Sequence, residues 1–208
     1  MGLRRFMANQ LRKPSGWFGS LVISRGMNRG NRRITERALE LLEIRPGDQV
    51  LEIGFGGGIG LRAVLQRLAV GAVTGIDLSP DMVRRAERRF RREIGDGRLR
   101  VQIGDIARLP YPDAAFDRVF SINTIYFWPD ITAGFHEIRR VLKKGGRTAI
   151  GLRSREKMQW SGFDREGYRL FAPQEVLEFM QAAGFRDLHL DHRYQDRAYD
   201  DVVVVGTR

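Results

Sequence analysis

A short apolar strand that runs directly into a cluster of glycines most constrains the fold of this 208-residue chain. The segment reads Val-Leu-Glu-Ile-Gly-Phe-Gly-Gly-Gly-Ile-Gly at residues 50–60, and apolar residues at helical spacing follow it. Glycines adopt positive φ at little cost and let a ligand lie on the backbone, while the following helix offers free N–H groups. The pattern therefore predicts a buried strand, a ligand-binding turn and a helix, as in an open α/β sheet.

Strand-like and helix-like segments alternate along most of the chain. The predicted strands are residues 49–53, 72–76, 99–103, 117–122, 147–152, 185–191 and 202–206. The first predicted helix starts near residue 31. The other predicted helices span residues 60–68, 79–92, 131–142 and 173–183. This alternation, with short connections, favours a mostly parallel sheet with helices on both faces. The last two strands follow each other without a helix, so we expect them to pair antiparallel.

The spacing of the glycines narrows the class of ligand. A dinucleotide fingerprint needs glycine at its first, third and sixth positions, and the sixth residue counted from Gly54 is Ile59. A P-loop is excluded because no Gly-Lys-Ser/Thr sequence occurs. Asp77 ends the second strand, where a carboxylate can accept from two ribose hydroxyls. Asp105 follows the third strand, where it could accept from an adenine amino group while Ile106 packs on the ring.

These elements, in this order, resemble the class I S-adenosylmethionine-dependent methyltransferases. More narrowly, they resemble the small bacterial ubiquinone/menaquinone-type enzymes, the methyltransferase type 11 group. The resemblance covers about residues 31–208 and includes Ile-Asp-Leu-Ser at 76–79, Glu-Ile-Arg-Arg-Val-Leu-Lys-Lys-Gly-Gly at 137–146 and Ala-Ala-Gly-Phe at 182–185. It implies a Rossmann-like sheet of seven strands with the last one antiparallel. It also implies an enzyme that uses S-adenosylmethionine, releases S-adenosylhomocysteine and needs no metal.

The resemblance also assigns roles to single residues. Those expected to hold the cofactor are Glu52 at the loop or amino group, Gly54, Gly56 and Gly58 around the methionine part, Asp77 at the ribose, Leu78 and Met82 beside the adenine, Asp105 and Ile106 at its edge, and Asn123 near the sulfonium. Those expected at the acceptor are Tyr126, Trp128, Trp160, Tyr168, Trp17 and Phe18. Loop orientation is the competing interpretation for Glu52, and core packing is the competing one for Met82 and the aromatics at 126–128.

Tyr126 and Asn123 are the candidate catalytic residues, and they would act by positioning. In-line methyl transfer depends mainly on holding the nucleophile close to the methyl carbon, and a general base is needed only if the acceptor must lose a proton. No histidine stands out as that base, and we expect no metal site. The resemblance and these residues favour a small-molecule acceptor, methylated at O, N or C.

Composition excludes several classes of protein. The chain has no cysteine, so disulfides, thiolate metal sites, cysteine nucleophiles and cytosine C5 chemistry are excluded. No apolar run approaches the roughly 18 residues of a spanning helix, and the N-terminal residues lack the pattern of a secretory signal. We therefore expect a cytoplasmic globular enzyme, and the sequence leaves open whether it is a monomer or a homodimer.

The net charge of +11 is unevenly distributed. Residues 1–33 carry eight basic residues and no acidic one, which leaves a surplus of three for the remaining chain. Residues 1–30 also contain large apolar groups, so they are predicted to form a basic amphipathic arm or lid in front of a methyltransferase domain at 31–208. Such an arm suits an anionic partner, so the alternatives are an RNA methyltransferase or an enzyme for a lipid or quinone at an anionic membrane. A non-enzymatic cofactor-binding scaffold is the fourth interpretation.

Overall fold

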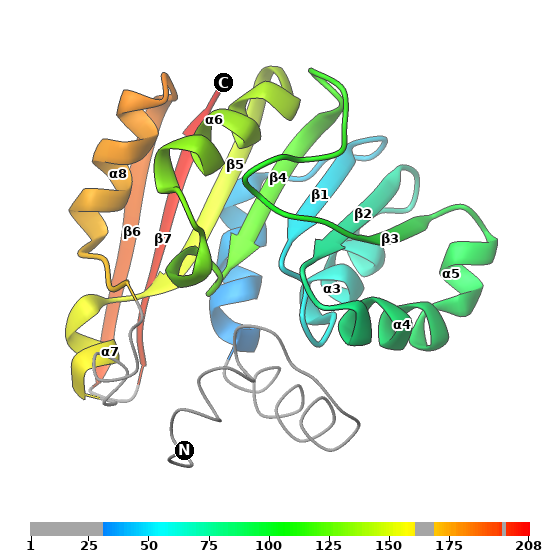
Figure 1. Cartoon of the computed structure of the whole chain (residues 1–208), viewed down its shortest axis with the longest axis horizontal. Coiled ribbons are helices and arrows are strands. Elements are labelled where there is room, and N and C mark those ends of the chain that lie inside the picture. The colour runs from blue at the N-terminus through cyan, green and yellow to red at the C-terminus, as the bar shows by residue number, and fades with distance from the viewer. Residues whose placement is uncertain (1–30, 161–168, 197–198) are drawn as a thin grey trace.

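A seven-stranded sheet forms the centre of the molecule (Figure 1). The computed structural model describes residues 31–160, 169–196 and 199–208. The strands are β1 (Gln49–Ile53), β2 (Ala72–Asp77), β3 (Leu99–Ile103), β4 (Phe116–Ile122), β5 (Leu142–Arg153), β6 (Arg186–Asp196) and β7 (Tyr199–Thr207), in the spatial order β3-β2-β1-β4-β5-β7-β6. The pairs from β3 to β5 are parallel, whereas β7 is antiparallel to both β5 and β6. The predicted Rossmann-like fold class is thereby confirmed.

The side chains of β1 alternate between two buried faces, which explains why this strand is apolar almost throughout. Leu51 and Ile53 belong to one cluster of buried residues, and Val50 belongs to the cluster on the opposite face. Glu52 shares the face of Val50, because alternate side chains of a strand point to the same side. The strand therefore brings one carboxyl group to a buried face, next to the glycine turn that follows.

Helices cover both faces of the sheet (Figure 1). A helix at residues 31–42, α3 (Ile59–Arg67) and α4 (Pro80–Arg89) contribute buried side chains to the cluster on one face. On the other face, α6 (Ile131–Val141) and α8 (Pro173–Ala182) do the same. The shorter elements are α5 (Arg91–Gly95), α7 (Arg155–Trp160) and the 3-10 turn η1 (Ile125–Phe127). Among the described residues, no helix has the length and apolarity needed to cross a membrane.

Two elements differ from their predicted bounds. The helix predicted at 79–92 divides into α4 and α5, because Phe90 leaves helical geometry with φ −112° and ψ 27°. Its ring packs against the glycine turn, where a Cβ on Gly58 would stand 2.9 Å from it. The strand predicted at 147–152 already begins at Leu142, which pairs with Phe116 across a register shift. Both differences arise from tertiary contacts that local spacing does not encode.

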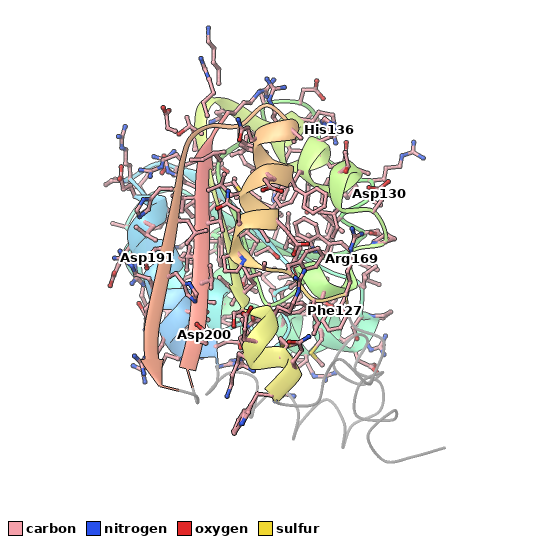
Figure 2. All side chains as sticks on the ribbon, turned by 90° about the vertical axis from the view of Figure 1, so that its left-hand side faces the viewer. Phe127, Asp130, His136, Arg169, Asp191 and Asp200 are labelled. Atoms are coloured by element: carbon pink, nitrogen blue, oxygen red, sulfur yellow. The ribbon has the colours of Figure 1, made fainter. Side chains whose placement is uncertain are left out.

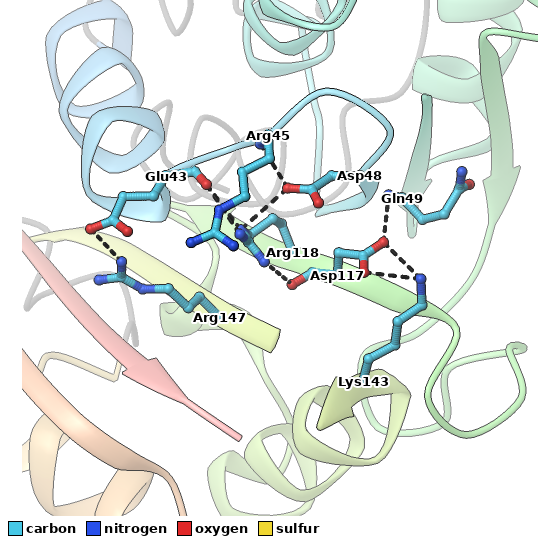
Figure 3. A network of polar contacts seen from close by, with 8 residues as sticks. All are labelled: Glu43, Arg45, Asp48, Gln49, Asp117, Arg118, Lys143 and Arg147. Atoms are coloured by element: carbon cyan, nitrogen blue, oxygen red, sulfur yellow. Dashed lines mark hydrogen bonds and ion pairs between the residues drawn. The ribbon is translucent and has the colours of Figure 1, made fainter. Parts of the chain in front are cut away.

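A polar network holds the amino ends of β1 and β4 together (Figure 3). The buried guanidinium of Arg118 lies 3.4 Å from Asp48 Oδ2 and also donates to two backbone carbonyl oxygens. The neighbouring Asp117 accepts from the Gln49 N–H at 2.8 Å and from Lys143 Nζ at 2.8 Å. These contacts fix the amino ends of the two strands, and the cleft described next lies at their carboxyl ends.

Candidate active site

A cleft opens where β1, β2 and β4 end. It spans about 890 Å³ of space between atoms, with the open solvent at its mouth included. Helix 31–42, the glycine turn, the loops after β2 and β3, and the segment that contains η1 all contribute to its walls. Of the residues predicted from the sequence, those that line it are Glu52, Gly54, Gly56, Asp77, Leu78, Met82, Ile106, Asn123 and Trp128.

The glycine turn has a backbone that only glycine adopts readily. Gly54, Gly56 and Gly58 have φ values of +72°, +47° and +72°. The N–H of Gly54 donates to the Ile76 carbonyl at 2.7 Å, and a Cβ on Gly54 would stand 2.4 Å from Thr124 Cγ2. Gly58 is the N-cap of α3 and does not itself line the cleft. The turn therefore fits tightly between β2 and the segment after β4 and leaves its backbone open to a ligand.

Asp77 connects this turn to the start of α4. Its Oδ2 accepts from the Gly56 N–H at 2.8 Å, and its Oδ1 accepts from the Ser79 N–H at 2.9 Å. Burial raises the pKa of Asp77, although both hydrogen bonds oppose that shift. Each carboxylate oxygen can accept a second hydrogen bond. Asp77 therefore holds the turn in place and still offers acceptors to the cleft.

Glu52 places a second carboxyl group in the cleft wall. The side chain is 4% exposed, and the Leu61 N–H at the start of α3 donates to it. A Cβ on Gly60 would stand 2.2 Å from Glu52 Oε1, so only glycine at 60 leaves room for this carboxyl group. Burial raises the pKa of Glu52 well above its usual range, and the charge of Asp77 adds to the effect. Among the described residues, Glu52 Oε2 has no hydrogen-bond partner. In folded proteins such a buried atom usually has a partner, which can be a water, an ion or a ligand.

An apolar wall lies beside Asp77. Leu78, Met82 and Ile106 line it, and both Met82 and Ile106 are buried. Asp105 is not a lining residue, and its Oδ1 accepts from the Ala107 N–H at 2.9 Å. This hydrogen bond stabilises the turn that presents Ile106, and a contact between Asp105 and the adenine edge stays a prediction.

The three consecutive aromatic residues after β4 take different positions. Phe127 and Trp128 line the cleft and Tyr126 does not, although Tyr126 and Trp128 are similarly buried members of one core cluster. The Tyr126 hydroxyl accepts from the Arg153 N–H at 2.5 Å and lies 3.2 Å from Asn123 Oδ1. Burial raises the pKa of Tyr126 above its usual range. Tyr126 is therefore absent from the described cleft lining, and its contact with an acceptor stays a prediction.

Asn123 lines the cleft at the end of β4. It is a non-glycine residue with φ +55°, a region that asparagine tolerates better than most residues. Its N–H donates to the Gly151 carbonyl at 2.8 Å, and its Nδ2 donates to Asn31 Oδ1 at 2.9 Å. These contacts fix the carboxamide of Asn123 in the cleft wall.

Among the described residues expected at the acceptor, Trp160 also does not line the cleft. Trp160 is 66% exposed at the end of α7, with Lys157 Nζ 4.2 Å from its ring centroid. Trp17, Phe18 and Tyr168 lie outside the described residues, as does the predicted arm at 1–30.

Sequence reasoning missed several lining residues, above all Asn31, Thr35 and Thr124. Thr35 is 1% exposed, and within the described part of the chain its Oγ1 has no hydrogen-bond partner. Asn31 and Thr35 lie four residues apart on one helix face, and this polar pair was a readable signal. Thr124 has no such signal: its hydroxyl accepts from Trp128 Nε1 at 3.0 Å, a contact that depends on η1.

No histidine lies in the cleft lining among the described residues. His136 is exposed on α6, and Figure 2 shows it well apart from Phe127. His192 Nε2 is 2.6 Å from Asp200 Oδ1, so it belongs to the β6–β7 hairpin, where Figure 2 labels Asp200. The described residues contain no group of three side chains able to hold a metal ion. The ionisable side chains of the described lining are therefore Glu52 and Asp77.

Comparison with known proteins agrees with this geometry. A family model described as a methyltransferase domain matches residues 51–150. The methyltransferase YdaC of Bacillus subtilis, itself uncharacterized, is 32% identical over 78% of this chain and 85% of its own length. A chloroplastic 2-methyl-6-phytyl-1,4-hydroquinone methyltransferase of rice is 30% identical over 87% of this chain but only 56% of its own length.

The fold is also that of solved methyltransferases. A phosphoethanolamine N-methyltransferase of Haemonchus contortus, solved with S-adenosyl-L-methionine, aligns with a TM-score of 0.78 at 19% identity, over 97% of this chain and 60% of that one. At this identity the likeness concerns the fold. Together with the match to YdaC over most of both sequences, these findings show that the chain belongs to the class I S-adenosylmethionine-dependent methyltransferases.

Proposed function

We propose that this methyltransferase binds S-adenosylmethionine in the cleft at the ends of β1, β2 and β4 and methylates a small molecule in the same cleft. One observation carries the proposal. The positive-φ glycine turn and the Asp77 carboxylate meet in a single lining, fixed by the hydrogen bond from the Gly56 N–H to Asp77. Backbone N–H groups beside an acid at a strand end suit a nucleoside with a charged tail.

The residues present suit the cofactor chemically. Asp77 has spare lone pairs for the two ribose hydroxyls, and Leu78, Met82 and Ile106 offer an apolar slot for a planar base. Glu52 presents a buried oxygen without a partner, which suits an ammonium group. Asp105 remains a candidate for the adenine edge, because its Oδ1 is held by the Ala107 N–H and its carboxylate can accept further hydrogen bonds.

Phe127 and Trp128 are our candidates for the acceptor side of the cleft. Aromatic faces favour planar or cationic molecules. Asn123 adds a fixed carboxamide, and we assign Tyr126 to positioning because its hydroxyl lies beside Asn123 Oδ1. A planar quinol is a second candidate acceptor, favoured by these two rings and by the name of the rice relative.

When bound, the cofactor supplies an electrophilic methyl group on a sulfonium. The protein's contribution is to bind the acceptor, orient its nucleophilic atom and exclude water. Both ionisable residues of the described lining, Glu52 and Asp77, belong to the β1–β2 side that we assign to the cofactor. Catalysis is therefore expected to rest on proximity and orientation.

Two measurements test this function. Calorimetry should detect S-adenosylhomocysteine binding with one site per chain, and absence of binding would reject the cofactor assignment. A screen with methyl-labelled S-adenosylmethionine against small metabolites, quinols in vesicles, and RNA should label the small molecules or the quinols. Labelling of RNA alone would replace the small-molecule proposal by the RNA methyltransferase alternative.

A further inference from the structure

Arginine side chains from α3 and α4 gather beside the glycine turn. Helices α4 and α5 together carry six arginines and three acidic residues. One of the acidic residues, Asp81, already pairs with Arg84 on the same helix. Arg85 and Arg89 lie one turn apart, and residues at this spacing share one side of a helix. Helix α4 therefore carries a basic side that ends next to the turn.

Arg62 of α3 joins this group at the ring of Phe90. The Cζ atoms of Arg62 and Arg89 lie 5.8 Å and 5.3 Å from the centroid of that ring. The same ring packs against the glycine turn, because a Cβ on Gly58 would stand 2.9 Å from it. Figure 1 shows α3 and α4 on the same side of the sheet. Two guanidinium groups from different helices therefore meet beside the turn.

Arg89 contacts the glycine turn directly. Its Nη1 donates to the Gly57 carbonyl at 2.7 Å, and Gly57 is one of the residues that line the cleft. A guanidinium has five N–H donors in a planar fork, so one carbonyl oxygen leaves several of them for another acceptor. Arg62, Arg85 and Arg89 are themselves absent from the cleft lining. The cluster therefore adjoins the cleft without being part of it.

The positive charge of this cluster is not balanced by nearby carboxylates. Within the described part of the chain, neither Arg62 nor Arg89 forms an ion pair with an acidic side chain. Partial desolvation and the charges of Arg62 and Arg85 lower the pKa of Arg89. Residues 1–33 contain no Asp or Glu, so that segment supplies no counter-charge. An anion bound here would relieve the repulsion between like charges.

We propose that Arg62, Arg85 and Arg89 form a binding site for a phosphate monoester beside the glycine turn. The planar fork of arginine matches the oxygens of a phosphate group and can donate to two of them at once. A phosphate monoester carries close to two negative charges above its second pKa of about 6, which suits a cluster of several cations better than a single carboxylate does. The site goes beyond the proposed function, because it takes a second ligand outside the cleft. Its phosphate belongs either to a dissolved compound or to the headgroup of a lipid.

The first experiment titrates inorganic phosphate into the full-length protein at pH 8 and constant ionic strength, with chloride as the exchanged anion. Calorimetry should show saturable binding of one phosphate per chain. Arg62→Gln and Arg89→Gln should each weaken that binding about tenfold or more, as for a lost hydrogen bond between charged groups. Arg186→Gln is the matched control, because it removes the same charge from an exposed position on β6, at the opposite edge of the sheet. Its affinity should stay within about twofold of the wild type, and circular dichroism should show that all variants are folded.

The second experiment separates the two sources of phosphate. Wild type, the double variant Arg62→Gln/Arg89→Gln and Arg186→Gln are sedimented with phosphatidylcholine vesicles that contain or lack phosphatidic acid. Binding to phosphatidic acid that is lost only in the double variant supports a lipid headgroup. Saturable binding of inorganic phosphate, with vesicle binding independent of Arg62 and Arg89, supports a dissolved compound.

Two results would overturn the site. The first is a wild-type protein that shows neither saturable binding of phosphate nor binding to phosphatidic acid that depends on Arg62 and Arg89. The second is an equal loss in Arg89→Gln and Arg186→Gln, since binding would then follow net charge alone. Neither result depends on the cofactor, so both are distinct from a failure of S-adenosylhomocysteine to bind.

Discussion

The charged side chains at the two ends of the central strands differ in whether they have hydrogen-bond or ion-pair partners. At the amino ends, Arg118 lies beside Asp48 and donates to two carbonyl oxygens, and Asp117 is bonded to a backbone N–H and to Lys143 (Figure 3). At the carboxyl ends, Glu52 has a buried oxygen without a partner in the described chain. The charged groups drawn at the amino ends therefore have partners, whereas one carboxyl oxygen at the carboxyl ends has none among the described residues.

The carboxyl groups of the two ends shift their pKa values in opposite directions. Burial by itself would raise the pKa of Asp117, but the hydrogen bonds from the Gln49 N–H and Lys143 outweigh it and the pKa is lowered. Burial raises the pKa of both Glu52 and Asp77. A lowered pKa means that the ionised group stabilises the fold, and a raised one means that it destabilises the empty protein. The difference teaches that the ionised Asp117 stabilises the fold at one end, whereas the ionised forms of Glu52 and Asp77 destabilise the empty protein at the end that we propose binds the ligand.

Removing Arg118 should give the largest effect on stability. Arg118→Ala leaves the buried Asp48 carboxylate without its cation, which typically costs about 3–5 kcal/mol of unfolding free energy. Urea denaturation measures this loss, and the folded variant should bind S-adenosylhomocysteine as the wild type does. Lys143→Ala is the control from the same network: its side chain is 42% exposed, so the loss should be about 1 kcal/mol or less. Equal losses in the two variants would contradict the importance of burial here.

Adding one methyl group to the glycine turn should lower cofactor affinity, whereas the same change at a glycine away from the cleft should not. Gly54→Ala places a Cβ 2.4 Å from Thr124 Cγ2 at φ +72°. Gly97 has nearly the same φ, +71°, with nothing within 4 Å of an added Cβ. The backbone cost of about 1–2 kcal/mol is shared, and the steric cost of about 1–3 kcal/mol falls on Gly54→Ala alone. Calorimetry should show cofactor affinity lowered about tenfold or more in Gly54→Ala and unchanged in Gly97→Ala; similar affinities would refute the tight fit of the turn.

Cofactor affinity should depend on pH through Glu52. An ammonium beside Glu52 favours its charged form, so binding lowers the raised pKa and releases a proton. Affinity for S-adenosylhomocysteine should therefore increase with pH between the lower pKa of Glu52 in the complex and its raised pKa in the empty protein, by at most about tenfold per pH unit. Asp77 faces the same cleft with a pKa raised in the same direction, so Glu52→Gln should flatten only part of this slope. An unchanged slope in Glu52→Gln would exclude the assignment.

The same raised pKa values set the stability of the empty protein. A group whose pKa is higher in the folded than in the unfolded state favours folding at low pH, and that contribution is lost as pH rises through the folded-state value. Glu52→Gln should therefore weaken the decrease in unfolding free energy as pH rises. Thermal melts at several pH values measure it, and a variant that melts in parallel with the wild type at every pH would argue against a buried, titrating Glu52.

The smallest effect is expected from Tyr126. Tyr126→Phe removes a hydroxyl bonded to the Arg153 backbone, which should cost about 1 kcal/mol of stability. Because Tyr126 lies behind Asn123, cofactor affinity should change less than twofold, and the effect on turnover should appear once an acceptor is known. A tenfold loss of cofactor affinity would place Tyr126 in the cofactor site after all.

The sequence was sufficient to predict those parts of the candidate site that are formed by residues close together in the chain. The strand–glycine–helix segment and Asp77 at the end of β2 are readable because an apolar run, its turn and its terminal acid lie close together in the chain. Sequence reasoning expected Tyr126 at the cleft, where the lining contains Phe127 and Trp128 instead, because periodicity does not show how a 3-10 turn distributes three adjacent rings. It missed the bond between Asn31 and Asn123, which lie 92 residues apart and meet only through packing of helix 31–42 on the sheet. It also missed the division of the helix at Phe90, whose ring packs against the distant glycine turn at Gly58.

Titration of S-adenosylhomocysteine into the wild-type protein and Asp77→Ala tests the central claim most directly. Asp77 joins the glycine turn to the cleft, and its removal takes away the acceptors assigned to the ribose. We predict that calorimetry detects binding to the wild type and an affinity at least about 100-fold lower in Asp77→Ala, while circular dichroism shows a folded protein. An unchanged dissociation constant in the folded variant would contradict the assignment of this end of the sheet to the cofactor.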